Sequence, residues 1–243
     1  MTVTLPELER VDPPVAVAII LRVLEQLENA HADGPRASLC PAEVWIDAYG
    51  RVALGPRSPA ADLRYVAPEH ANGVEIDTRA DLYVVGVMLW ELLTGQPHLV
   101  AASVSEAEVL ARSPRPSTPP STHTADIPRA LDGALHALLA VQPRGRPKTA
   151  GEARHRLAAA LPGALRVTDA TIGALAANAE ARHVRLGAAT PTPLLSAAMV
   201  EPTFLDPPAS GDAMRSRRDA RLITTFVVAS AVIVLILAWI VVA

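Results

Sequence analysis

The chain has 243 residues, a formal net charge of −3 and a single cysteine, Cys40. This charge gives no overall basic balance for binding nucleic acid, and one cysteine excludes an internal disulfide, so a reducing compartment is compatible. Half of the residues are hydrophobic but only 3% are aromatic, and a mixture rich in alanine, valine and leucine favours helices over a β-sandwich.

The first hundred residues predict a long helix, a hairpin and a buried helix. Apolar residues recur at helical spacing over 13–33, and Gly34-Pro35 ends that helix. Two short runs in EVWIDAYGRVAL, on either side of 48–50, predict a β-hairpin, and 57–64 a loop. The segment 81–94 is apolar nearly all round, which is typical of a helix at the centre of a domain.

Further helices are expected over 103–112, 128–141 and 149–161. The first and the last open with capping boxes, Ser103 with Glu106 and Thr149 with Glu152. The proline-rich segment 113–122 is interpreted as a solvated loop, with a polyproline ligand as the alternative. A weak alanine-rich helix over 168–184 is compatible with the sequence, and 188–212 has the composition of a flexible tether.

The segment 222–243 carries no charged side chain and predicts a transmembrane helix. As a helix it spans about 33 Å, enough to cross a hydrocarbon core of about 30 Å. Four basic residues lie just before it: Arg215, Arg217, Arg218 and Arg221. They indicate a single-pass, tail-anchored protein with its N-terminal part in the cytoplasm, and they also suit contact with anionic lipid.

Five motifs in register resemble the C-terminal lobe of bacterial serine/threonine protein kinases of the membrane-receptor type. They are LEQLENAHADG, PAEVWIDAYGRVAL, the triplet Ala67-Pro68-Glu69, DTRADLYVVGVMLWELLTGQPHL with Asp81 and Gly86, and LLAVQPRGRPKTAGE with Arg146. The resemblance implies a mainly α kinase-like C-lobe with a short β-hairpin. It divides the chain into an extension (1–12), this domain (13–161), a juxtamembrane tether (162–221) and the transmembrane helix (222–243).

The same resemblance implies structural roles for three charged residues. Glu69 and Arg146 match a buried ion pair that ties the activation segment to the last helices of the lobe. Asp81 matches a carboxylate that accepts backbone N–H groups of the catalytic loop, and such hydrogen bonds are charge-assisted.

The positions that carry kinase chemistry are occupied by other residue types. With Pro41 as the anchor, Ser38 stands where the family has its catalytic aspartate, Cys40 its lysine and Glu43 its metal-binding asparagine. Pro56 stands where the family has the aspartate that binds magnesium. No glycine-rich loop precedes the domain, and the sole lysine, Lys148, lies near its last helix.

The sequence therefore predicts a membrane-anchored, catalytically inactive kinase-like (pseudokinase) protein that acts as a cytoplasmic interaction or regulatory module in signalling. No cofactor and no metal are expected, because the seven histidines are scattered and Glu43 alone is a poor magnesium site. The alternative is an active or trans-complemented serine/threonine kinase that uses ATP and Mg²⁺. A protein partner is expected, either a kinase or a second copy of the chain, unless residues 1–12 or the tether cover the top of the lobe.

Overall fold

The computed structural model describes residues 2–36, 39–56, 62–113 and 118–185. All of them lie in the first of two compact units, Met1–Thr190. The predicted transmembrane helix at 222–243 and its four flanking arginines lie outside the described residues. Among the helices that are described, none is long and apolar enough to cross a membrane.

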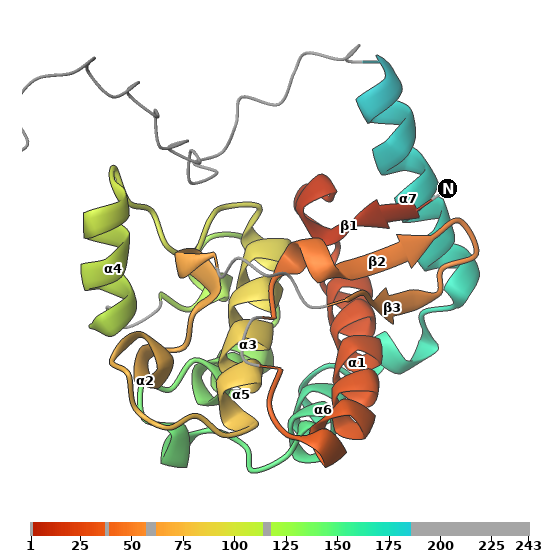
Figure 1. Ribbon diagram of the computed structural model, residues 1–243. Coiled ribbons are helices and arrows are strands. Elements are labelled where there is room, and N and C mark those ends of the chain that lie inside the picture. Colours follow the sequence, from red (N-terminus) through yellow and green to blue (C-terminus); the bar gives the residue numbers. More distant parts are fainter. Residues whose placement is uncertain (1, 37–38, 57–61, 114–117, 186–243) are drawn as a thin grey trace, which may run out of the picture. The chain divides into compact units, whose positions relative to one another are not determined.

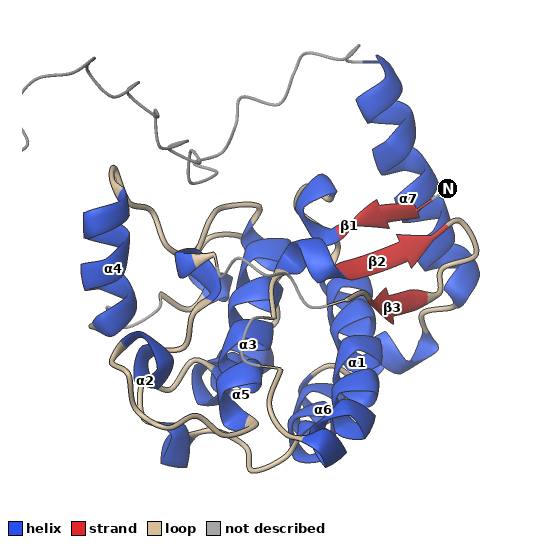
Figure 2. Cartoon of the chain, viewed as in Figure 1, coloured by secondary structure: helices blue, strands red, loops and turns tan. Residues whose placement is uncertain are grey.

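A helical body forms most of the unit (Figures 1 and 2). Its central helix is α3 (Arg79–Thr94), in which fourteen residues are buried, so the expectation of a helix inside the domain is confirmed. Around it pack α1 (Pro13–Ala30) and α5 (Arg129–Leu138), while α6 (Ala150–Ala160) lies against both α1 and α5. Two smaller helices, α2 (Pro68–Ala71) and α4 (Val104–Arg112), contact each other.

Both capping boxes that the sequence predicts are present. The backbone N–H of Glu106 donates to Ser103 Oγ over 3.2 Å at the start of α4. At the start of α6, the backbone N–H of Glu152 donates to Thr149 Oγ1 over 3.1 Å. These side chains satisfy N–H groups that have no partner inside the helix.

The predicted hairpin is present as β2 (Val44–Asp47) and β3 (Val52–Leu54). It belongs to a three-stranded antiparallel sheet in the order β1-β2-β3, because β1 (Thr2–Thr4) pairs along β2. The edge strand β3 lies against α1, where the Gln26 side chain donates to the carbonyl of Val52 and accepts from the N–H of Leu54. The Gln26 side chain thus fixes the edge of the sheet to α1.

Residues before the predicted domain boundary are part of the compact unit. After β1, a 3₁₀ turn (Leu5–Glu7) leads toward α1, and the apolar side chains of this stretch are buried: Val3, Leu5, Leu8 and Val11. They contribute to the same hydrophobic core as α1 and α3. Residues 2–12 therefore cover part of the helical body.

The compact unit also extends beyond residue 161. A 3₁₀ turn (Pro162–Arg166) packs on α1, and α7 (Asp169–Arg185) packs on β1 and β2. Side chains at helical spacing are buried under α7: Ile172, Ala176 and Ala179. The sequence assigns residues 162–185 to the tether, but these residues are packed. The buried stripe gives α7 an apolar face, which the intrinsic helix propensity of its residues does not reveal.

Two glycines allow α7 to approach the hairpin. A Cβ at Gly173 would lie 2.4 Å from the carbonyl oxygen of Ala48, and one at Gly50 would lie 1.8 Å from the carbonyl oxygen of Asp169. Gly50 also has φ +79°, a left-handed conformation that favours glycine. The close contact between helix and hairpin depends on the absence of side chains at both positions.

We expect Gly173→Ala to destabilise the domain by about 1–3 kcal/mol, because the new methyl group would meet backbone rather than a movable side chain. The matched control is Gly133→Ala in α5, where a Cβ would have no neighbour within 4 Å and alanine should stabilise the helix by about 0.5–1 kcal/mol. Urea unfolding of the two variants measures both effects. Equal stability of the two variants would contradict the packed position of α7.

Candidate functional site

The candidate catalytic positions lie on the segment between α1 and β2 and at the end of β3. Cys40 immediately precedes a 3₁₀ turn (Pro41–Glu43), and Glu43 is the last residue of that turn. Both side chains are buried. Pro56 follows β3 and is exposed. Ser38 lies outside the described residues. The fold thus brings Glu43 and the chain leading to Pro56 to the same end of the hairpin, where Gly55 donates its N–H to the carbonyl of Glu43 over 2.7 Å.

A salt bridge forms at this end of the hairpin between Arg36 and Glu43. Arg36 Nη2 lies 2.9 Å from Glu43 Oε2 and also donates to the carbonyl oxygen of Gly55 over 2.8 Å. The two side chains are 12% and 4% exposed, so water does not screen their charges strongly. Within the described part of the chain, the Arg36 Nε has no hydrogen-bond partner, so the contact with Glu43 is principally a charge pair through Nη2.

Asp81 contacts the same segment through the backbone of Arg36. Its carboxylate lies in the first turn of α3 and is 1% exposed. Oδ2 accepts the backbone N–H of Arg36 over 2.7 Å and lies 3.0 Å from His31 Nε2. Asp81 thus accepts a backbone N–H from this segment, and Arg36 is held at both its backbone and its guanidinium.

Sequence reasoning did not identify Arg36 or His31 as parts of the site. His31 lies in a 3₁₀ turn (His31–Asp33) just after α1, and Arg36 lies in irregular backbone seven residues before Glu43. A spacing of seven residues brings two side chains to one face only in a regular α-helix, and neither Arg36 nor Glu43 lies in one. The basic residue two positions before Ser38 was the only available signal.

Magnesium, which the kinase-like fold implies, does not fit the described residues at the candidate catalytic positions. Magnesium binds through carboxylates and needs near-ideal octahedral geometry. Glu43 already pairs with Arg36, and Pro56 offers no side-chain ligand at all. The described residues contain no group of three or more His, Cys, Asp or Glu side chains that could hold a metal ion.

The Cys40 thiol is held in its neutral form. Burial raises its pKa above the ordinary value, and the negative charge of Glu43 raises the pKa further. A thiolate is the nucleophilic form of cysteine. Cys40 therefore behaves as a small buried apolar side chain rather than as a nucleophile or a substitute for the lysine of the family.

The predicted pair of Glu69 and Arg146 is present and buried. Arg146 Nη1 and Nη2 lie 2.6 and 2.8 Å from the two oxygens of Glu69. Its remaining donors reach the carbonyl oxygens of Ala140, Arg79 and Val141, so all five N–H groups are used. The guanidinium also lies 4.9 Å from the centroid of the Tyr83 ring.

The other motif residues are buried elsewhere in the helical body. Ala67 precedes α2 and is buried together with Pro68, and Glu69 lies in the first turn of that short helix. Gly86 faces α5, where an added Cβ would lie 2.9 Å from Leu138 Cβ. The structure therefore brings Glu69 and Arg146 together although they are far apart in sequence, while Gly86 and Asp81 make separate contacts.

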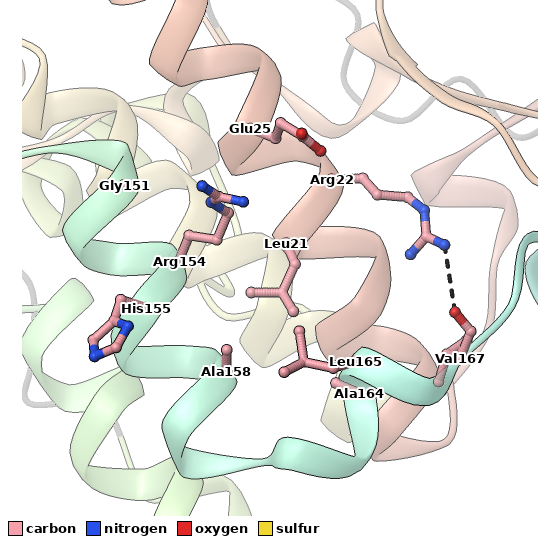
Figure 3. A pocket seen from close by; sticks show the side chains of 10 residues that line it. All are labelled: Leu21, Arg22, Glu25, Gly151, Arg154, His155, Ala158, Ala164, Leu165 and Val167. Carbon is pink, nitrogen blue, oxygen red and sulfur yellow. Dashed lines mark hydrogen bonds between the residues drawn. The ribbon is translucent and has the colours of Figure 1, made fainter.

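A pocket of about 500 Å³ lies elsewhere, between α1, α6 and the turn at 162–166 (Figure 3). Its floor is apolar, with Leu21, Ala158 and Ala164 among its lining residues. Arg22 at its edge donates to the carbonyl oxygen of Val167 and lies 2.5 Å from Asp169. None of the candidate catalytic residues lines this pocket.

The fold and the buried pairs define a kinase-like C-terminal lobe, and comparison with known proteins agrees. Over this region the chain is homologous to mycobacterial serine/threonine protein kinases. It is 30% identical over 175 residues to the serine/threonine-protein kinase PknB of Mycolicibacterium smegmatis, covering 63% of this chain and 28% of that protein. It is 32% identical over 156 residues to PknH of Mycobacterium bovis, with 58% and 26% covered.

Solved structures give the same relation. The kinase domain of PknI from Mycobacterium tuberculosis superposes with a TM-score of 0.52 and 26% identity, covering 62% of this chain and 56% of that domain. No family model matches the chain. The chain spans little more than a quarter of the length of the two kinases above, so the likeness is to one region of each.

Replacing Arg146 by methionine is expected to lower the free energy of unfolding by about 3–5 kcal/mol, because Glu69 would remain as a buried charge without its partner. Arg144→Met provides the control, since Arg144 is exposed two residues away and should change stability by about 0.5 kcal/mol or less. Denaturant titration of both variants decides the point. A loss for Arg146→Met no greater than for the control would show that the pair is not the tie we describe.

Alkylation of Cys40 by iodoacetamide at pH 8 should be slower in the folded chain than in the urea-unfolded chain by roughly tenfold or more, because its thiol is buried and its pKa is raised. Mass spectrometry measures the rate without ambiguity, since no other cysteine exists, and Cys40→Ser gives the background. Similar rates in the folded and unfolded chains would contradict a shielded, neutral thiol.

Proposed function

We propose that the chain is a catalytically inactive kinase-like protein that acts as an interaction or regulatory module, held at the cytoplasmic face of a membrane by its C-terminal segment. The proposal separates two sets of residues. The residues that support the lobe are present and make buried contacts: Glu69 with Arg146, and Asp81 with the backbone N–H of Arg36. The set that would move a phosphoryl group is replaced.

The observation that carries the proposal is that Glu43 is buried and paired with Arg36. Phosphoryl transfer depends on positioning and on stabilising negative charge through metal ions and cationic side chains. Glu43 is the one carboxylate among the candidate catalytic positions 38, 40, 43 and 56. It is buried and paired with Arg36 at 2.9 Å, which supports a structural role for this carboxylate in place of metal binding.

The membrane placement rests on the sequence. The segment 222–243 is uncharged and follows four arginines, a pattern that favours a single span with the domain in the cytoplasm. Residues 186–221 would separate the last described helix from the membrane. A tether of 36 residues has a root-mean-square span of about 30–36 Å if it behaves as a flexible coil, which would keep the domain close to the membrane.

A protein partner fits this placement, either a complete kinase in the same membrane or a second copy of the chain. Two large aromatic side chains on the hairpin are exposed, Trp45 by 44% and Tyr49 by 76%. Exposed aromatic residues are common in the central part of protein interfaces. Trp45 lies beside Gly55 and therefore next to the degenerate site, the candidate catalytic positions 38, 40, 43 and 56. It offers a complete kinase, our preferred partner, a contact surface there, whereas Tyr49 lies in the turn at the other end of the hairpin.

The test uses membranes that carry the full-length chain, with an active serine/threonine kinase in parallel membranes as the positive control. We expect no transfer of labelled phosphate from ATP to the chain or to a generic protein substrate, and no thermal shift at millimolar ATP and Mg²⁺. The chain should stay in the pellet after an alkaline wash and lose this property when 222–243 is deleted. Phosphate transfer by the purified chain would overturn the inactive assignment in favour of the kinase alternative, and release by the wash would overturn the tether.

A further inference from the structure

Arg36 connects three parts of the degenerate site. Its backbone N–H donates to Asp81 at the start of α3, over 2.7 Å. Its guanidinium reaches Glu43, immediately before β2, and the carbonyl of Gly55, immediately after β3. One residue therefore joins the central helix to the start of β2 and the end of β3, which lie at the same end of the hairpin.

The contact also answers an electrostatic requirement. A carboxylate as deeply buried as Glu43 is costly unless a cation or several donors compensate it. In a kinase the residues around this position serve metal ions and phosphates. Here the compensating charge is the guanidinium, which cannot lose its proton in a protein and which is itself only 12% exposed.

A metal ion and the guanidinium would both be drawn to the Glu43 carboxylate. A divalent ion there would share this carboxylate with the guanidinium, which lies 2.9 Å from Oε2, and the two positive charges would repel each other. Pro56 would give the ion no second ligand. The side chains present therefore favour the internal cation over an external one.

We propose that Arg36 is a resident cation that takes the place of the metal and holds Asp81, Glu43 and Gly55 in one arrangement that does not depend on nucleotide. This inference rests on the proposed inactive function. It says that the arrangement of the site is constitutive and is not switched by a ligand. Arg36 is a positioning residue in this role. A partner would meet the same surface whether or not ATP is present.

A double-mutant cycle on the full-length chain tests the proposal. Arg36→Met removes the charge at similar length, Glu43→Gln removes the opposite charge, and the double variant removes both. The matched control cycle is Arg154→Met with Glu28→Gln, because that pair is 3.5 Å apart and its side chains are 45% and 48% exposed. Urea unfolding followed by pulse proteolysis gives the unfolding equilibrium constant of each variant.

We expect the two substitutions at 36 and 43 to be coupled by at least roughly tenfold in the unfolding equilibrium constant, with the double variant more stable than Arg36→Met alone. The control pair should show coupling within roughly twofold to threefold, as exposed pairs usually do. If Arg36→Met does not fold, Arg36→Gln replaces it in the cycle, since it also removes the charge but leaves a polar side chain at this position.

A second readout addresses the metal directly. Electron paramagnetic resonance with Mn²⁺ should detect no binding to the unmodified chain at millimolar concentration, nor to Arg154→Met. Mn²⁺ binding by the unmodified chain, or additive effects at 36 and 43, would overturn the assignment of Arg36. Neither of these results requires phosphate transfer, so the inference can fail while the inactive function stands, and label transfer from ATP would remove both.

Discussion

A buried carboxylate needs a partner, and this requirement organises the described domain. Three acidic side chains are buried among the described residues: Glu43, Glu69 and Asp81. Each lies beside a nitrogen-bearing side chain, from Arg36, Arg146 and His31 respectively. Each contact joins segments that are separate in the fold, so the three pairs determine how the loops lie on the helices. Removing one partner would leave a charge that the low-dielectric interior cannot accommodate.

Much of the helical body could be predicted because its signals are local. The segment of α3 is apolar nearly all round, and only a helix at the centre of a domain can bury such a surface. The capping-box sequences that begin at Ser103 and Thr149 predict where two helices start. The backbone N–H groups of Glu106 and Glu152 donate to these two side chains, as expected. These signals need no knowledge of the rest of the chain.

The parts that were not predicted depend on tertiary contacts. Strand β1 has three residues, too few for a period, and it forms because β2 offers an edge and the core accepts Val3. The packing of α7 depends on Gly173 and Gly50, whose importance becomes visible only when Ala48 and Asp169 lie opposite them. Arg36 was missed for the same reason, because its contact with Glu43 becomes visible only when the fold brings the two side chains within 2.9 Å.

The structural pairs and the degenerate site follow one electrostatic rule. Glu69 is compensated by a guanidinium whose five donors are all used, which makes this pair a permanent tie between α2 and the segment before α6. Glu43 stands where a kinase would supply a metal-binding amide, and a carboxylate there adds a negative charge to a buried place. Without a metal, that charge requires an internal cation, and Arg36 lies within 2.9 Å of it. Burial of Glu43 therefore favours keeping the guanidinium in place, and the positive charge of the guanidinium in turn opposes a metal ion at the same carboxylate. Stability of the loop and exclusion of the metal are consequences of the same contact, which is why we interpret the degenerate site as a fixed surface rather than as an impaired catalyst.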